Sequence, residues 1–338
     1  MSHAAPAVSA TAMTPTADSP RKLVAIVLGL VTVLTLMLLA FAAPALGSGP
    51  SGLPLAVSGP PQATSQVVAA LDQQAPGTFD VTMHATADEA KQAILDREAI
   101  GGISVGPRGV TIQTAAGAGA AYTQLLTGIG SGLEESGQQV THEELAPTTT
   151  DDPSTIGVAT LGMPLVFGGM ATAAILLLVF KGSFGSRLLG AGSIAVLGGL
   201  VAAAVLQLGF GAFDASYWQV ALAIAFGIFA ISSTVLGLGT LLGTPGIGLG
   251  AVTMLFVANP LSGQANGPQW LPSPWGEVGQ YLPIGAAGSL IRSVAFFGGG
   301  GGTHPALVLG AWVLAGVALG LIGVARSQRA AARLETLA

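Results

Sequence analysis

The sequence predicts a polytopic α-helical membrane protein with six transmembrane helices and a small extracytoplasmic α/β domain between the first and the second. Three observations lead to this prediction. Of 338 residues, 51% are hydrophobic and 8% are charged, and the mean hydropathy is +0.71, whereas soluble domains carry roughly a quarter charged residues. Six apolar stretches have about the length that a bilayer crossing requires. The charged residues are also divided unequally among the segments that join these stretches.

The charge distribution predicts the orientation in the membrane. Seven basic residues flank apolar stretches, namely Arg21, Lys22, Lys181, Arg187, Arg326, Arg329 and Arg333. The segment 47–155 instead holds twelve acidic residues and three basic ones. Because basic flanks stay in the cytoplasm, we expect a multi-pass protein of a bacterial cell membrane with both termini cytoplasmic and 47–155 outside. The net charge of −5 argues against nucleic acid as a partner. The high hydropathy makes the lipid bilayer the expected surrounding medium.

The first apolar stretch follows a polar terminus. Residues 1–22 are rich in Ala, Ser, Thr and Pro, which predicts a disordered cytoplasmic tail. Residues 23–46 are predicted to be the first transmembrane helix. A cleaved signal peptide is the alternative, because Ala43-Pro44-Ala45 resembles a cleavage site. The apolar run is longer than the usual signal-peptide core, which favours an uncleaved anchor, and in both cases the next segment is exported.

Residues 47–155 show the patterns of a soluble α/β domain. Thr86 and Glu89 have the spacing of a capping box that opens a helix reaching about Asp96. The other predicted elements are strands at 53–57, 79–83 and 139–145, helices at 65–74 and 120–135, and a hairpin that pairs 102–105 with 110–113. About 100 residues suffice for a modest hydrophobic core of its own.

Residues 156–326 are predicted to form a five-helix transmembrane domain, followed by a cytoplasmic tail at 327–338. The expected spans are Ile156–Phe180, kinked at Pro164, then Leu188–Phe210, Trp218–Leu238, Leu241–Ala258 and Pro305–Ala325. Prolines and glycines interrupt 259–302, which therefore reads as a re-entrant or interfacial outer segment.

This outer segment is the candidate outer gate or interface, and its candidate residues are Asn259, Pro260, Trp270, Trp275, Tyr281 and Arg292. The aromatic rings suit the level of the lipid headgroups. A lone arginine in an apolar helix usually extends to the surface, so we expect Arg292 to do so, with binding of a lipid phosphate as the alternative.

Several classes of chemistry have no residues to support them. The chain has no cysteine and no phosphate-binding loop, and its four histidines are scattered without metal-ligand spacing. Neighbouring acids such as Glu134 and Glu135 point in different directions and read as solvated charge. The predicted spans contain no ionisable residue, which argues against proton- or ion-coupled transport. We therefore expect no enzyme, no metal and no cofactor.

The order of segments resembles a known family. One span, a sizeable outer domain and five further spans with a broken outer segment look like the type-2 ABC exporter permeases, in particular the YhgE/Pip-like bacterial branch. The residues that carry this resemblance are Asn259–Gly263, Leu271–Gly276 and Leu282–Ser293. The chain differs in lacking an amphipathic helix before the first span and in having a short loop at Lys181–Arg187.

The resemblance implies a function and partners. It implies a permease subunit that moves an unidentified amphipathic or envelope-related substrate outward, works with a separate ATPase subunit and pairs as a homo- or heterodimer. It also implies a re-entrant helical element at 272–297 and contact with the ATPase through the loop that holds Lys181 and Arg187. The alternative is a non-transporting scaffold or receptor that displays its acidic outer domain to an envelope partner.

Overall fold

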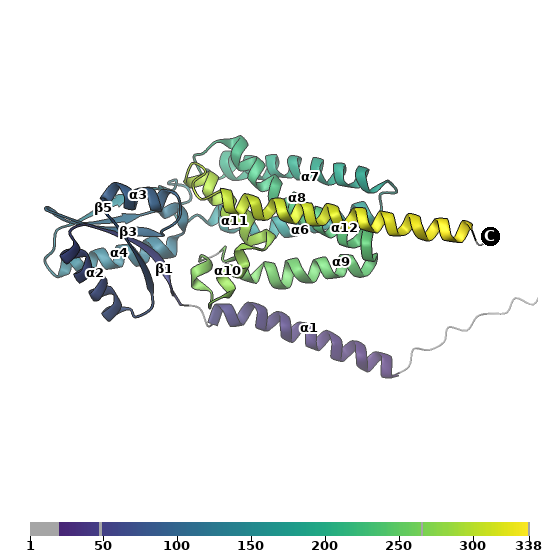
Figure 1. Cartoon of the computed structure of the whole chain (residues 1–338), viewed down its shortest axis with the longest axis horizontal. Helices are drawn as coiled ribbons and strands as arrows, with labels where there is room; N and C mark the ends of the chain where they lie inside the picture. Colours follow the sequence, from purple (N-terminus) through teal and green to yellow (C-terminus); the bar gives the residue numbers. More distant parts are fainter. Residues whose placement is uncertain (1–19, 47–48, 265, 337–338) are drawn as a thin grey trace, which may run out of the picture.

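The structure, a computed structural model, describes residues 20–46, 49–264 and 266–336. An α/β domain and a helical bundle lie end to end along the long axis (Figure 1). The predicted disordered tail lies outside the described residues except for its last three, Pro20 to Lys22, which begin helix α1 (Pro20–Leu46).

The α/β domain is built on one five-stranded sheet. The strands are β1 (Leu53–Ser58), β2 (Phe79–His84), β3 (Gly101–Gly106), β4 (Gly109–Thr114) and β5 (Val140–Glu144), in the order β2-β1-β3-β4-β5. Strand β1 is parallel to β2 and β3, β3 and β4 are antiparallel, and β4 and β5 are parallel. The predicted hairpin is thereby confirmed as β3–β4.

Helices cover both faces of this sheet. They are α2 (Pro61–Gln74), α3 (Ala87–Leu95) and α4 (Ala120–Glu135), with a short turn η1 (Ala116–Ala118) before α4. Helices α2 and α4 pack on one face over a core that includes Leu55, Ile112 and Leu126. Helix α3 packs on the other face through Ala90 and Ile94. Alternation of apolar side chains along the strands supplies one core for each face.

Two local predictions in this domain are confirmed in detail. The predicted helix 120–135 is α4, with the same bounds. The side chain of Thr86 caps α3 by accepting the N–H of Glu89 at 3.2 Å, and the Glu89 carboxylate accepts the N–H of Ala85 at 2.9 Å. Both interactions satisfy N–H groups that lie at the start of the helix.

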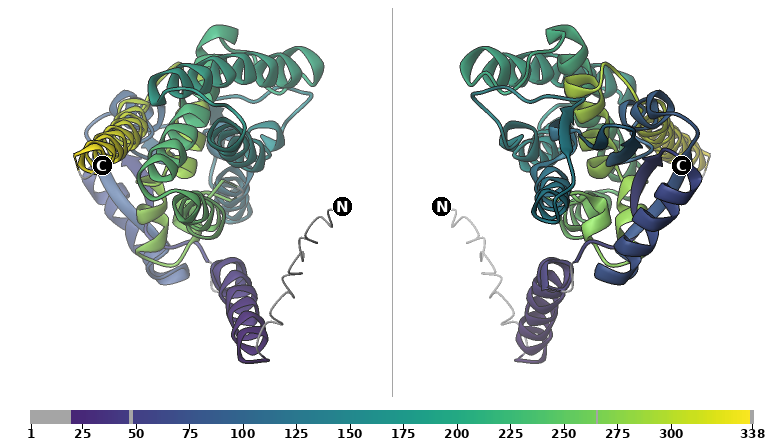
Figure 2. Two further views of the ribbon diagram at one scale, coloured as in Figure 1. Left: turned by 90° about the vertical axis from the view of Figure 1, so that its right-hand side faces the viewer. Right: turned by 90° about the vertical axis from the view of Figure 1, so that its left-hand side faces the viewer.

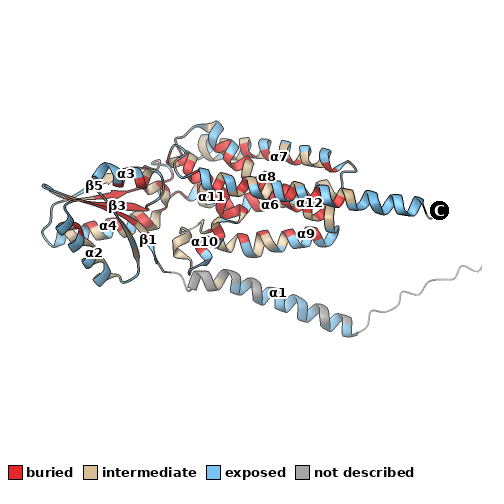
Figure 3. Ribbon diagram, in the orientation of Figure 1, coloured by how far each residue is buried: buried red, intermediate tan, exposed pale blue. Residues whose placement is uncertain are grey.

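The bundle contains the remaining helices. They are α5 (Ile156–Ala159), α6 (Gly162–Leu178), α7 (Phe184–Ala204), η2 (Val205–Gly209), α8 (Tyr217–Leu242), α9 (Thr244–Ala251), η3 (Val252–Ala258), η4 (Pro260–Ser262), η5 (Pro268–Trp270), α10 (Trp275–Gln280), α11 (Pro283–Phe296) and α12 (Thr303–Glu335). Helix α8 is the buried centre, packed by α6, α7, α11 and α12. Many apolar residues of α7 and α12 are exposed, and Figure 3 colours much of these two helices as exposed. Such exposure suits helices surrounded by lipid.

Within the described residues, four helices are long and apolar enough to cross a bilayer. They are Ile156–Leu178, Phe184–Gly209, Tyr217–Leu242 and Thr303–Glu335, with 23, 26, 26 and 33 residues. The predicted span Leu241–Ala258 is observed as a helix from Thr244 to Ala258, which is shorter than the roughly 20 residues that a crossing needs. Helix α1 has 27 residues and is apolar after Arg21 and Lys22. It contacts η3 and η4, while much of its length lies away from the bundle (Figure 2). The structure thus shows four candidate spans, and the count of six stays a prediction.

Two helix boundaries differ from expectation. Helix α12 continues ten residues past the predicted stop at Ala325, because the Ala, Gln and Arg residues that end a membrane span are good helix formers. The break in the predicted first span of the bundle falls between α5 and α6, just before Pro164, rather than at a kink centred on the proline.

Close helix contacts in the bundle depend on small residues. A Cβ atom on Gly316 of α12 would lie 2.5 Å from the carbonyl oxygen of Ser233 on α8. The Ser233 and Thr234 hydroxyls donate to the carbonyl of Ala230 at 3.2 and 2.8 Å. The Thr234 hydroxyl also lies 3.3 Å from the carbonyl of Trp312 on α12, so these polar side chains hydrogen-bond to helix backbone within α8 and across to α12.

Candidate functional site

The broken segment 259–302 joins the two parts of the molecule. Its elements η4, η5, α10 and α11 lie at the end of the bundle that faces the α/β domain (Figure 1). Two glycines permit the tight folding of α10, since a Cβ atom on Gly276 would meet the Pro268 carbonyl and one on Gly279 the Leu261 carbonyl. A sequence rich in Gly and Pro thus gives a compact turn instead of a span.

Helix α11 is buried on nearly all sides. It contacts α8 and α12 in the bundle and η1 in the α/β domain. Broken backbone at membrane depth is tolerated only when protein covers it. The packing of α11 therefore meets this requirement, whereas its position relative to a bilayer stays a prediction.

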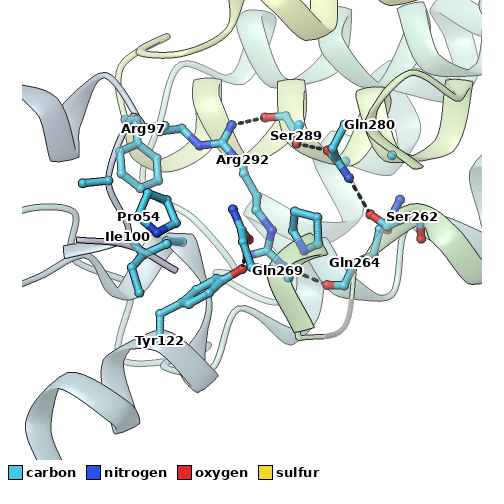
Figure 4. A pocket seen from close by; sticks show the side chains of 18 residues that line it. Pro54, Arg97, Ile100, Tyr122, Ser262, Gln264, Gln269, Gln280, Ser289 and Arg292 are labelled. Atoms are coloured by element: carbon cyan, nitrogen blue, oxygen red, sulfur yellow. Dashed lines mark hydrogen bonds between the residues drawn. The ribbon is translucent and has the colours of Figure 1, made fainter. Parts of the chain in front are cut away.

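A cavity of about 80 Å³ lies between the α/β domain and the broken segment. Figure 4 shows side chains from both parts pointing into it. The α/β domain contributes Pro54, Arg97, Ile100 and Tyr122, and the broken segment contributes Ser262, Gln264, Gln269, Gln280, Ser289 and Arg292. This volume has room for several water molecules or a small ligand group.

Arg292 does not reach the surface. Its side chain is only 9% exposed. Its guanidinium donates to the carbonyls of Gly117 at 3.2 Å and Gln264 at 3.0 Å, and to the hydroxyl of Thr155 at 3.2 Å. The expectation that it extends to the surface is therefore wrong. The α/β domain covers α11, and oxygen atoms of the protein accept the hydrogen bonds of the guanidinium group.

Arg97 enters the cavity from the turn after α3. The N–H groups of Arg97 and Glu98 donate to the carbonyls of Ile94 and Ala93, which is the hydrogen-bond pattern of a Schellman motif. Arg97 has φ = 61°, at a position that usually takes glycine. This backbone turn sends the side chain across to α11, where it donates to the carbonyl of Ser289 at 2.6 Å.

Both guanidinium groups remain charged at neutral pH. Burial and the charge of Arg292 lower the pKa of Arg97 to about 10, which is still well above 7. The guanidinium of Arg97 also lies 5.5 Å from the centre of the Phe297 ring, a favourable cation–π distance.

Neutral polar groups complete the wall of the cavity. Ser289 donates to Gln280 at 2.7 Å, and Gln280 donates to the Ser262 carbonyl at 3.0 Å. The Tyr122 hydroxyl donates to the Gln269 side chain, and burial raises the pKa of this phenol. Amide and hydroxyl groups therefore hold the broken segment in place without adding negative charge.

The carboxylate of Asp152, which lies near Arg292, forms its hydrogen bonds with the backbone at the start of α5. Asp152 accepts the N–H groups of Ile156 and Gly157 at 2.8 and 2.7 Å, and so caps the start of α5. Among the described residues, the ion pairs link Lys91 to Glu143 and His142 to Glu134. Neither arginine of the cavity takes part in them.

The other candidate residues of the outer segment are dispersed around the cavity. Trp270 packs beside Tyr122, and its indole N–H has no hydrogen-bond partner within the described part of the chain. Trp275 and Tyr281 are 51% and 61% exposed. Asn259 and Pro260 sit where η3 turns into η4.

Lys181 and Arg187 lie at the opposite end of the bundle. The Arg187 guanidinium donates to the Phe180 carbonyl at 3.3 and 3.1 Å and so caps the end of α6, while Lys181 is exposed. Arg187 also lines a cleft of about 500 Å³ formed by the α6–α7 loop, the α8–α9 turn and α12. The two candidate regions predicted from the sequence are therefore separated by the length of the bundle.

Sequence reasoning did not identify Arg97, Tyr122 or Gln264 as site residues. Arg97 stands between Asp96 and Glu98 and reads as ordinary solvated charge. The described residues contain no group of three His, Asp or Glu side chains placed to share a metal ion. The chemistry available to the cavity is that of hydrogen-bond donors and positive charge.

Comparisons of the chain with protein-family models, with curated proteins and with solved structures find no match.

Proposed function

We propose that this chain is the membrane subunit of an exporter that is driven by a separate ATPase subunit. The observation that supports it is the difference between the two ends of the bundle. One end is covered by the α/β domain and the broken segment, and the other has an open cleft bordered by basic residues. An exporter needs such a division between an outer exit and an inner site for its ATPase.

The basic end is proposed to face the cytoplasm. Lys181 lies in the loop beside the cleft, Arg187 lines the cleft from the first turn of α7, and Arg326 and Arg329 follow on α12. The start of α1 lies at this end too (Figure 1). Concentration of positive charge at one end agrees with the positive-inside rule and supports the proposal that both termini are cytoplasmic.

The cleft is the proposed site of contact with the ATPase subunit. Its walls come from three separate helical connections, so a partner seated there would contact α6, α8 and α12 together. Because α8 is the buried centre of the bundle, movement at the cleft would be passed to every helix that packs on it. Pairing with a second permease chain remains part of the proposal.

The proposal is tested by co-purification and by flux. The tagged chain, expressed in its own host, is expected to retain an ATPase subunit, and reconstituted vesicles are expected to show ATP-dependent export. Ser327→Arg fills the cleft from an exposed position and should abolish retention, whereas Ala330→Arg on the same helix lies outside the cleft wall and should not. An ATPase subunit absent from the wild-type preparation would overturn the proposal.

A scaffold that displays the α/β domain is the second candidate. The observation in its favour is the fixed attachment of this domain, since Arg97 and Tyr122 bond directly to the broken segment. Retention of an envelope partner without an ATPase, and retention that survives Ser327→Arg, would identify this function.

A further inference from the structure

The cavity between the α/β domain and α11 contains more hydrogen-bond donors than the protein satisfies. A guanidinium group has five N–H donors. In the described structure Arg97 uses one nitrogen, for Ser289, whereas Arg292 uses two, for Gly117, Thr155 and Gln264. Arg97 is only partly buried and lines the cavity, so its remaining N–H groups are available to a ligand.

The cavity also contains unbalanced positive charge. Two guanidinium groups line it, and the single carboxylate of Asp152, which lies near Arg292 outside the cavity wall and bonds two backbone N–H groups, offsets only part of their charge. Burial of like charges is unfavourable unless an opposite charge or several acceptors compensate for it. An anion in the cavity would supply that compensation and would accept the remaining N–H groups.

Two residues beside the cavity have strained backbone conformations. The non-glycine residues with positive φ in the described structure are Arg97 at 61° and Thr155 at 56°. Arg97 is one member of the arginine pair, and Thr155 accepts a hydrogen bond from the other. A β-branched residue at positive φ is unfavourable, and such strain is typical of sites where the surroundings hold a group in position.

We propose that this cavity binds a phosphate group, held between the guanidinium groups of Arg97 and Arg292. Guanidinium groups match phosphate oxygens in a forked arrangement. A phosphate presents acceptors in several directions, so one ligand serves an arginine on each side. The phosphate belongs either to a lipid headgroup, which fits the exposed Trp275 and Tyr281 on the same segment, or to a soluble phosphorylated compound.

Binding of phosphate there would connect the two parts of the molecule. Arg97 belongs to the α/β domain and Arg292 to α11, so the ligand would add a link to the direct hydrogen bonds that already join them. The site would act in the same way in an exporter and in a scaffold, and the inference does not rest on the proposed function.

The full chain in maltoside detergent tests the inference in two arms. In the first, isothermal titration measures binding of sodium phosphate, with sodium chloride holding the ionic strength constant. In the second, native mass spectrometry compares retention of phosphatidylglycerol with retention of diacylglycerol, which has the same acyl chains and no phosphate. Saturable binding in the first arm identifies a soluble source, and selective retention of phosphatidylglycerol identifies a lipid headgroup.

Variants connect that binding to the cavity. Arg97→Gln removes a charge-assisted donor while leaving the extensive bonds of Arg292, and is expected to weaken binding by about 10- to 100-fold. Arg108→Gln, in the exposed turn of the β3–β4 hairpin, is the matched control and should bind as the wild type does. Circular dichroism and size-exclusion profiles establish that each variant is folded.

Three results would overturn the inference. The first is the absence of selective phosphate binding in both arms. The second is equal binding by Arg97→Gln and Arg108→Gln. The third is equal competition by chloride, which would show a site without preference for phosphate.

Discussion

Substitution of Gly279 by alanine tests the packing that positions the outer segment. Its ideal Cβ atom would lie 2.6 Å from the carbonyl carbon of Leu261 and closer still to the carbonyl oxygen. Ordinary contacts between carbon atoms are about 3.5–4.0 Å. Backbone cannot move aside as a flexible side chain can, so α10 would have to shift by roughly 1 Å or more.

The cost of this shift follows from the bonds that α10 makes. Gln280 is held at 3.0 Å from the Ser262 carbonyl and 2.7 Å from the Ser289 hydroxyl, and movement of that size stretches both bonds. Overpacking costs about 1–3 kcal/mol and each neutral hydrogen bond about 1 kcal/mol, while alanine returns about 1 kcal/mol of helix propensity. With both bonds weakened, the net destabilisation of the segment is therefore about 2–4 kcal/mol.

The absence of cysteine makes the measurement direct. Ser262→Cys places one thiol at a buried position of the segment, and its rate of reaction with a maleimide reports local opening. Gly279→Ala is expected to raise this rate roughly 30- to 900-fold. Gly248→Ala, where no neighbouring atom lies within 4 Å of the new Cβ, is the matched control. Equal rates in the two variants would show that α10 does not pack on the Leu261 carbonyl.

Three further substitutions test other parts of the fold. Thr86→Ala removes the cap of α3 and should destabilise the α/β domain by about 1 kcal/mol in chemical denaturation, and unchanged stability would contradict the capping box. Gly316→Ala pushes α12 away from Ser233, and this overpacking should destabilise the bundle by about 1–3 kcal/mol. The thermal aggregation temperature in detergent should therefore fall, and an unaltered temperature would refute the close crossing of the two helices. The hydrogen bond to Glu143 raises the pKa of Lys91 above 10.5, the ordinary pKa of lysine. As pH increases, the stabilisation from this pair is therefore complete up to about pH 10.5 and is lost as pH rises through the raised pKa. Lys91→Met should lose this part of the alkaline destabilisation, and an identical alkaline profile would exclude it.

The α/β domain was predictable because its signals are local. A capping box at Thr86, alternation along β1 and a Pro-Arg-Gly turn between β3 and β4 each specify a few neighbouring residues. Strand order was not predictable in the same way. Strand β1 lies between β2 and β3, with Leu55 in the core on one face of the sheet and Ala56 in the core on the other. This order depends on how the helices pack over the two faces, which no short stretch of sequence specifies.

The bundle shows why hydropathy alone misplaces boundaries. Lipid compatibility and helix formation are separate properties, so the arginines after Ala325 end the apolar stretch while α12 continues to Glu335. Conversely, Thr244–Ala258 is apolar but too short to match a full crossing. The sequence correctly indicated a mostly helical chain with apolar helices of membrane-spanning length and a small α/β region. The predicted count of six crossings depends on these two kinds of segment and stays a prediction.

The candidate cavity was the least predictable part because it is made from distant residues. Arg97 and Arg292 come from different parts of the chain, and each looks ordinary by itself: one reads as surface charge, the other as a side chain that extends to the headgroups. Their environment arises only when the Gly117 carbonyl and the Ser289 carbonyl approach from opposite parts. No short stretch of sequence predicts that these distant residues lie close together in the structure.

The same residues constrain any mechanism that involves motion. Because Arg97 bonds to α11, and α11 packs on the central helix α8, the α/β domain cannot rotate against the bundle without breaking the contact between Arg97 and Ser289. Either the domain moves together with α11, or separation of the α/β domain from the bundle begins by releasing this cluster. A phosphate held by both arginines would strengthen the first behaviour. Occupancy of the cavity would therefore decide whether the outer end acts as a rigid cap or as a gate.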